Sequence, residues 1–213
     1  MGTHCSNLPV ALTRSTDASL PLTFHAVPTT SYAPITPAEL DAVLMRLAEL
    51  ARADGIELRL RITGGAVMML VFNARKLGTR DVDVLSAQPS DRLAKYAAII
   101  AREHGWPETW LNDSAKKFEQ DAAIPDSEDV ELRSEPGLLV TRPSLRRLLA
   151  WKLARYADDA DRDDALELLR HILRETPYDR NDLQTQLEGH LAASERTRMS
   201  YNLEDVWELY ESA

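Results

Sequence analysis

The segment from Ile62 to Leu85 constrains the fold of this chain more than any other stretch of its sequence. It reads as a strand, a Gly64-Gly65 pair, a short apolar helix, and a second strand that carries Asp81 and Asp83. Residues i and i+2 of a strand point to the same face, so the two carboxylates project side by side while the intervening valines turn into the core. Adjacent carboxylates repel each other, and a hard divalent cation with oxygen ligands is the commonest reason to pair them.

The glycine pair predicts a close approach between backbone amides and a ligand, because glycine adopts turns that other residues avoid. Phosphate is the usual ligand of amides at the start of a helix. Each motif alone has an ordinary explanation: a tight strand-to-helix turn for the glycines, and an exposed acidic strand edge for the Asp-x-Asp. In this order, on a strand, a helix and a strand, they indicate a magnesium-dependent phosphoryl or nucleotidyl transfer site.

Composition and charge exclude several classes of protein. The 213 residues are 44% hydrophobic, which suffices for a packed core in one large or two small domains. No apolar run reaches the length of a membrane span and no secretion signal is evident, so we expect a cytoplasmic protein with no membrane partner. The single cysteine, Cys5, excludes an internal disulfide and a cysteine-based zinc site. The net charge of -9 argues against a general nucleic-acid coat.

Basic residues nevertheless cluster in one short region, for which a solvated helix face and a local basic surface are both open explanations. The members of this cluster are Arg133, Arg142, Arg146, Arg147, Lys152 and Arg155.

Hydrophobic periodicity predicts mixed helices and strands up to residue 142, and helices alone after Pro143. Thr36-Pro37-Ala38-Glu39 is a capping box that begins the first helix. A short turn or helix is expected at 106–113. Helices are expected at 37–52, 64–74, 89–104, 144–158, 161–174, 179–193 and 202–210. Strands are expected at 56–63, where charged residues alternate with apolar ones as in a half-exposed strand, and at 80–85, 130–133 and 138–141.

This pattern predicts an α/β (α+β) fold, in which a mixed sheet with flanking helices is followed by a C-terminal helical bundle. We expect an extended N-terminal segment over residues 1–35, an α/β domain over 36–142 and a helical domain over 143–213.

Lys152 lies on an apolar helical stripe, which is unusual unless its amine finds a partner or reaches a cleft. A triphosphate or an acidic residue would serve as that partner, and snorkelling to the surface is the alternative. The stripe is formed by Leu145, Leu148, Leu149 and Tyr156.

The motifs together resemble the nucleotidyltransferase superfamily that includes DNA polymerase beta. Its pattern is Gly-Gly or Gly-Ser opening a helix, then Asp-x-Asp on the next strand, then a third carboxylate between apolar residues on a later strand. Val130-Glu131-Leu132 matches the last element. Glu131 is therefore expected as the third acid, with Asp129 and Glu135 as alternatives. The other explanation for Glu131 is that it is an ordinary outward-facing strand residue without a role in the site.

A closer resemblance is to bacterial nucleotidyltransferases of the AbiEii toxin type, over roughly residues 36–175. One departure is Leu77-Gly78 before Thr79, where relatives often have a basic residue; here Arg75 and Lys76 lie further upstream. The matching segments are Gly64-Gly65-Ala66-Val67, Thr79-Arg80-Asp81-Val82-Asp83 and Trp110-Leu111-Asn112-Asp113, followed by Lys152, Arg155 and Asp161-x-x-Asp164.

The resemblance implies an enzyme that moves a nucleotide from a nucleoside triphosphate to a hydroxyl of an RNA such as transfer RNA, or of a protein. It also implies a toxin neutralised by a partner antitoxin. One or two Mg²⁺ ions would be held by Asp81, Asp83 and Glu131, and catalysis would use these acids with Lys152. The nucleotide would be bound by Gly64, Gly65, Thr79, Arg80, Lys152 and Arg155. The alternatives are a catalytically inactive binding protein of the same fold, acting as an antitoxin or partner-binding module, and a metal-dependent phosphohydrolase.

Overall fold

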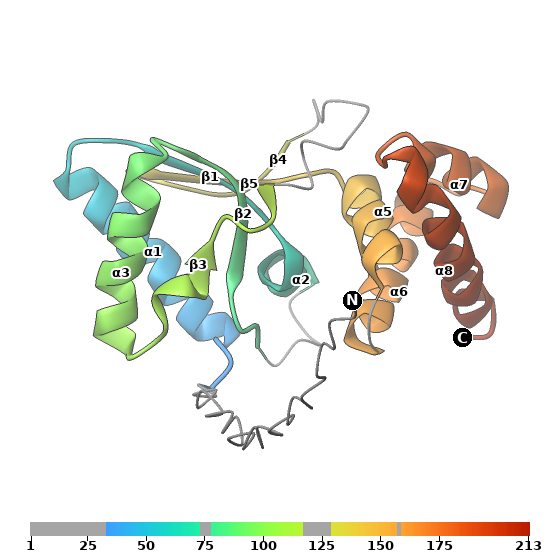
Figure 1. Cartoon of the computed structure of the whole chain (residues 1–213), viewed down its shortest axis with the longest axis horizontal. Helices are drawn as coiled ribbons and strands as arrows, with labels where there is room; N and C mark the ends of the chain where they lie inside the picture. Colours follow the sequence, from blue (N-terminus) through green and yellow to red (C-terminus); the bar gives the residue numbers. More distant parts are fainter. Residues whose placement is uncertain (1–32, 73–77, 117–128, 157–158) are drawn as a thin grey trace, which may run out of the picture. The chain divides into compact units, whose positions relative to one another are not determined.

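The computed structural model of this chain describes residues 33–72, 78–116, 129–156 and 159–213 (Figure 1). The contact pattern separates Met1–Ser31 from a second unit, Tyr32–Ala213, and the fold described below is that of the second unit. The expected N-terminal segment therefore lies outside the described residues up to position 32, as do Arg75 and Lys76.

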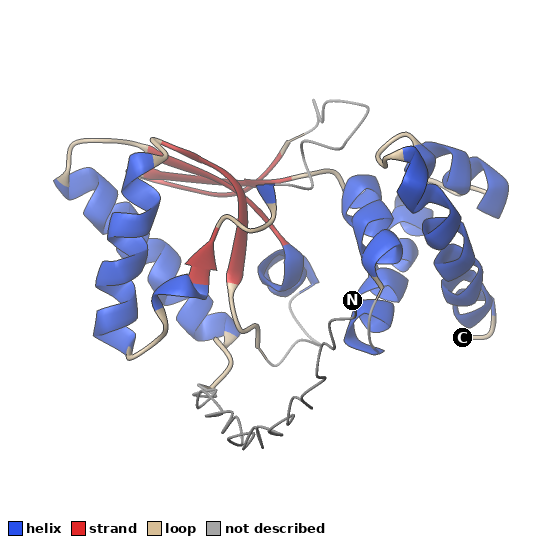
Figure 2. Ribbon diagram, viewed as in Figure 1, coloured by secondary structure: helices blue, strands red, loops and turns tan. Residues whose placement is uncertain are grey.

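A mixed sheet forms the middle of the N-terminal half (Figure 2). Its strands follow the order β3-β2-β1-β5-β4. Strand β1 is antiparallel to β2 and parallel to β5, β2 is parallel to β3, and β4 is antiparallel to β5. The strands are β1 (Leu58–Thr63), β2 (Val82–Gln88), β3 (Leu111–Asn112), β4 (Val130–Glu135) and β5 (Leu138–Arg142).

Helices flank this sheet, and only helices follow it, which confirms the predicted α+β fold with a C-terminal helical part. The helices beside the sheet are α1 (Pro37–Ala53), α2 (Gly64–Phe72) and α3 (Asp91–His104). The helices after it are α5 (Leu145–Arg155), α6 (Asp159–Glu175), α7 (Arg180–Glu188) and α8 (Ala193–Glu211).

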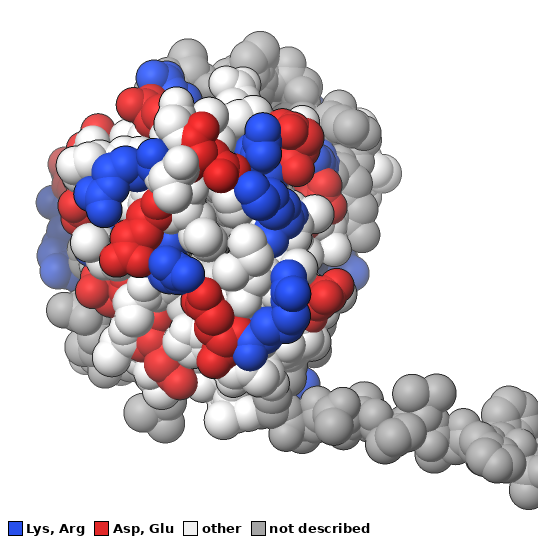
Figure 3. Space-filling model, turned by 90° about the vertical axis from the view of Figure 1, so that its left-hand side faces the viewer, with Lys and Arg blue, Asp and Glu red and all other residues white. Residues whose placement is uncertain are grey.

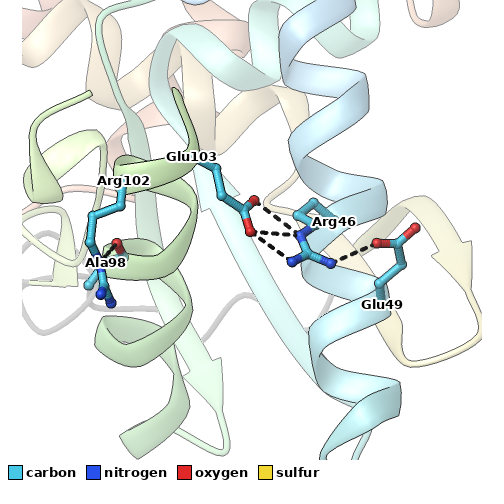
Figure 4. Close-up of polar contacts among 5 residues, drawn as sticks. All are labelled: Arg46, Glu49, Ala98, Arg102 and Glu103. Carbon is cyan, nitrogen blue, oxygen red and sulfur yellow. Dashed lines mark hydrogen bonds and ion pairs between the residues drawn. The ribbon is translucent and has the colours of Figure 1, made fainter. Parts of the chain in front are cut away.

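Helix α1 begins where the sequence predicts. Thr36 accepts a hydrogen bond from the Glu39 amide, and the Glu39 carboxylate accepts one from the Thr36 amide, so the capping box is complete. Arg46 joins α1 to α3 through an ion pair of 2.7 Å with Glu103 and holds Glu49 of its own helix at 3.0 Å (Figure 4). The side of the molecule formed by α1 and α3 mixes acidic and basic side chains and carries no large patch of one sign (Figure 3).

The C-terminal helices pack around α5, which contacts α6, α7 and α8. Asn202 of α8 donates a hydrogen bond of 2.6 Å to the Leu153 carbonyl of α5. Helix α8 begins at Ala193 and therefore extends well before the predicted start at residue 202, while α7 ends at Glu188, before the predicted end at 193. Among the described helices, none is both long and apolar enough to cross a membrane.

One local prediction was wrong, and strand order explains it. The first strand was expected to be half-exposed, but β1 lies between two neighbours and Arg61 is only 8% exposed, paired with Asp129 at 2.6 Å. The short turn or helix expected at 106–113 is present as a 3-10 helix (Glu108–Trp110), and it leads into edge strand β3, which was not predicted. Trp110 anchors this segment in the core: its indole is buried and donates a hydrogen bond to the Ala97 carbonyl.

Candidate functional site

The two aspartates of the Asp-x-Asp motif lie at the start of β2. Asp83 is within the strand and Asp81 immediately precedes it, and both are partly buried. The valines on either side of Asp83, Val82 and Val84, are fully buried in the core. The alternation expected of a strand therefore places the two carboxylates on the opposite side from the core.

The carboxylates are close enough to repel each other. Burial raises the pKa of Asp83 from 3.8 to about 6, and the Asp81 charge adds to the rise, while Lys152 and a hydrogen bond from Asn112 oppose it. Burial also raises the pKa of Asp81, against the opposing charge of Arg80. A pair of partly desolvated carboxylates is an electrostatically costly arrangement that a bound cation would relieve.

Gly64 packs directly against this pair. It lies at the junction of β1 and α2 with φ 69°, and its neighbour Thr63 stands opposite Asp83 in the β1–β2 pairing. A Cβ at position 64 would lie 2.6 Å from Asp83 Oδ2. Any other residue would therefore meet both backbone strain and the carboxylate, so glycine is required here for two separate reasons. Gly65 follows in the first turn of α2.

A cavity of about 130 Å³ adjoins Asp83 and Gly64. One wall comes from the sheet and α2, through Thr63 and Met68, and the other from α5 and α6. Its polar groups from the helical side are Lys152, Arg155 and Asp161. The structure therefore brings Lys152 and Arg155, which are distant in sequence from Gly64 and Asp83, to the same cavity.

Lys152 has both of the environments that its place on an apolar stripe predicts: acidic partners and a cleft. Its Nζ lies 2.7 Å from Asp161 Oδ1 and 2.8 Å from Asp164 Oδ2. Burial lowers the pKa of Lys152, but the two carboxylates outweigh burial and raise the pKa overall. The lysine is therefore a fixed positive charge at the cavity and also ties α5 to α6.

The remaining residues expected to bind the nucleotide take different positions. Arg155 lines the cavity and forms an ion pair of 3.2 Å with Glu195. Thr79 is buried: its hydroxyl donates to the Asp81 carbonyl at 3.0 Å, and its backbone exchanges two hydrogen bonds with Ile35. Thr79 therefore positions Asp81 rather than lining the cavity. Arg80 is exposed, with its charge felt by Asp81.

Glu131, the expected third acid, lies apart from the aspartate pair. It is an exposed residue of β4, and β1 and β5 stand between β4 and β2. Three strand spacings place it about 14 Å away across the sheet. The alternatives Asp129 and Glu135 form ion pairs with Arg61 and Arg133. In the part of the chain that the structure describes, no group of three His, Cys, Asp or Glu side chains is arranged to hold a metal.

The donor set nevertheless fits Mg²⁺. This ion commonly binds proteins through one or two carboxylates and completes its shell with water and substrate phosphates. Asp81 and Asp83 supply such a pair of oxygen ligands, and the cavity adjoins Asp83. A third protein carboxylate is therefore not needed for binding the ion.

Sequence reasoning gave no role to two residues that the structure places at the site. Asn112 of β3 stands beside Asp83 in the parallel pairing, and its amide hydrogen bond lowers the Asp83 pKa. The Trp-Leu-Asn motif was the available signal for it. Trp151, next to Lys152, lines the cavity, with the Arg147 guanidinium 5.7 Å from its ring. Its burial in a helix bundle left no signal in the sequence.

Comparison of the chain with protein-family models, with curated proteins and with solved structures finds no match.

Proposed function

We propose that this chain is a magnesium-dependent nucleotidyltransferase that moves a nucleotide from a nucleoside triphosphate to a hydroxyl. One observation carries the proposal: Asp83 lies against the positive-φ turn at Gly64, at the edge of a cavity whose far wall holds Lys152. This arrangement offers metal ligands, space for a phosphate beside backbone, and a fixed cation within one small volume.

The residues divide the work by their chemistry. Asp81 and Asp83 would hold Mg²⁺, which when bound neutralises phosphate charge and orients the triphosphate. Gly64 and Gly65 leave room for phosphate oxygens beside the start of α2. Lys152 and Arg155 would balance the charge of the departing pyrophosphate. Asn112 and Thr79 act indirectly, by holding Asp83 and the Asp81 backbone.

Ligand-induced stabilisation tests the proposal. Magnesium with a saturating nucleoside triphosphate should stabilise the folded chain by roughly 2.7 kcal/mol at one hundred times Kd, which corresponds to a rise in melting temperature of about 5–10 °C for a protein of this size. Asp81→Asn should lose the shift, and Asp91→Asn, an exposed aspartate at the start of α3, should keep it. No shift with any of the common triphosphates would contradict the proposal.

A second candidate function is nucleotide binding without transfer. It is favoured by the position of Glu131, which leaves the aspartate pair without a third carboxylate among the described residues. Labelled triphosphate incubated with RNA or with protein extract separates the two: binding without label on any acceptor would favour the second function. The acceptor and a partner antitoxin stay predictions.

A further inference from the structure

A second cavity, of about 250 Å³, lies where β5 gives way to α5 and where α6 ends. It shares no lining residue with the cavity at Asp83. Its walls combine a few apolar side chains with basic and hydroxyl groups and one carboxylate. The polar lining residues are Arg142, Ser144, Arg146, Glu175, Thr176 and Tyr178.

The two arginines are held in place by the protein. Arg142 is 9% exposed, and its Nη1 donates a hydrogen bond of 2.8 Å to the Pro143 carbonyl. Arg146 Nη1 donates to the Tyr178 hydroxyl at 2.9 Å. A guanidinium has five N–H donors and can keep a protein contact while it binds an oxyanion. Arginines fixed in this way lose little side-chain freedom when a ligand arrives, which favours binding.

The start of α5 adds to the positive character of the cavity. Ser144 caps this 11-residue helix, and its hydroxyl accepts from the Arg147 amide. The amides of the first helical turn have no partner within the helix, and the helix dipole favours negative charge at this end. Leu145 and Arg146, which open the helix, both line the cavity. Two guanidiniums and a helix start therefore converge on one volume.

The charge balance of the cavity is opposite to that of the whole chain. Two arginines face one carboxylate, that of the exposed Glu175, whereas the chain carries a net charge of -9. Hydroxyls from Thr176 and Tyr178 add hydrogen-bonding groups of the kind that contact phosphate oxygens. A compact anion with several acceptor oxygens matches this set of donors.

We propose that this cavity is a phosphate-binding site, distinct from the cavity at Asp83 and independent of the proposed transferase activity. The two cavities are successive along the contact between α5 and α6. Leu148 and Leu168 line the first, while Leu145 and Ile172, one turn away on the same helices, line the second. One turn is about 5.4 Å of helix axis. The phosphate belongs either to the backbone of a nucleic-acid strand or to a free phosphate compound.

Titration calorimetry of the full chain tests the site, with inorganic phosphate and a short single-stranded oligoribonucleotide as the two probes. Arg146→Gln should weaken binding of the occupying probe by about tenfold or more, the range for a lost charge-assisted hydrogen bond. Arg174→Gln is the matched control, because Arg174 lies in the last turn of α6 but does not line the cavity. Phosphate should bind equally well with a chelator present, which separates this site from the first one, where binding is proposed to depend on Mg²⁺.

The two probes distinguish the source of the phosphate. If both probes bind, and Arg146→Gln but not Arg174→Gln weakens their binding, the result supports a nucleic-acid backbone as the source of the phosphate. If inorganic phosphate binds and the oligoribonucleotide does not, the result supports a free phosphate compound. If Arg146→Gln fails to fold, Thr176→Val, at an exposed position, should weaken binding several-fold instead. The proposal would be overturned if neither probe binds, or if Arg146→Gln and Arg174→Gln weaken binding equally.

Discussion

Replacing Asp83 by asparagine should stabilise the protein in the absence of metal and at alkaline pH. The carboxylate is partly buried and faces the charge of Asp81, and these two effects raise its pKa to about 6. At pH 8 the folded chain therefore holds an ionised group in an environment that disfavours the charge. Asparagine has nearly the same shape and no charge, so the substitution removes this cost while leaving the neighbouring backbone unchanged.

The size of the gain follows from the pKa. The rise from 3.8 to about 6 is roughly two units, which at about 1.4 kcal/mol per unit gives an upper limit of about 3 kcal/mol. Because the Asp83 side chain is partly exposed, solvent screens part of this cost, and we expect a gain in unfolding free energy of ~1–3 kcal/mol.

The sign of the pH dependence is also fixed. Because the pKa is higher in the folded chain, the folded state binds more protons between the two pKa values, and the contribution of Asp83 to stability falls as pH rises from 3.8 to about 6.

Urea unfolding at pH 8 and pH 5 measures the effect. The stabilisation by Asp83→Asn at pH 5 should be about half of that at pH 8, because the wild-type carboxyl is by then largely protonated in the folded state. Asp113→Asn is the control: a hydrogen bond from Lys116 lowers the Asp113 pKa, so its replacement should give no gain at pH 8. Equal destabilisation by Asp83→Asn at both pH values would refute the electrostatic reasoning.

Two further substitutions test the geometry of the site. Gly64→Ala should destabilise the fold by ~1–3 kcal/mol in urea unfolding. The loss should exceed that of Gly55→Ala, because both glycines have positive φ but only a Cβ at position 64 would meet Asp83. Equal losses in the two variants would contradict the close approach of Gly64 to Asp83. Lys152→Met should destabilise the fold by ~3 kcal/mol, because it removes the ammonium group that pairs with Asp161 and Asp164. It should also raise the Asp83 pKa further in an NMR titration. An unchanged Asp83 pKa would contradict an electrostatic interaction between Lys152 and Asp83.

The sequence predicted the parts of this fold that depend on local chemistry. The capping box at Thr36 and the apolar face of α1 specify a helix wherever it packs, and the prediction is confirmed. Strand β3 is different, because two residues, Leu111–Asn112, form a strand only when the edge of β2 is free to pair with them. Arg61 was misjudged for the same reason: its burial follows from the central place of β1, which depends on the order of strands.

The site shows the same division. Gly64 and Asp83 lie close in sequence on a strand, a helix and a strand, so their approach could be expected from the pattern. Lys152 could be found because a charged residue on an apolar stripe needs an explanation, and its two carboxylate partners supply one. A third acid could not be located in this way, because which strand lies beside β2 is decided by the packing of the whole sheet and not by the apolar residues around Glu131.

The charge around the first cavity explains why a metal and a nucleotide would bind together. Asp83 and Asp161 line the cavity opposite Lys152 and Arg155, so the charged side chains of its wall balance. Two further aspartates, Asp164 beside Lys152 and Asp81 beside Asp83, add negative charge just behind that wall. A bare triphosphate would add to an excess of negative charge, whereas the same triphosphate with Mg²⁺ brings the cation that the aspartate pair lacks. Binding of either component should therefore strengthen binding of the other by the same factor. A nucleoside triphosphate that stabilised the chain equally well in the presence of a chelator would show that Lys152 and Arg155, and not the aspartates, control the cavity.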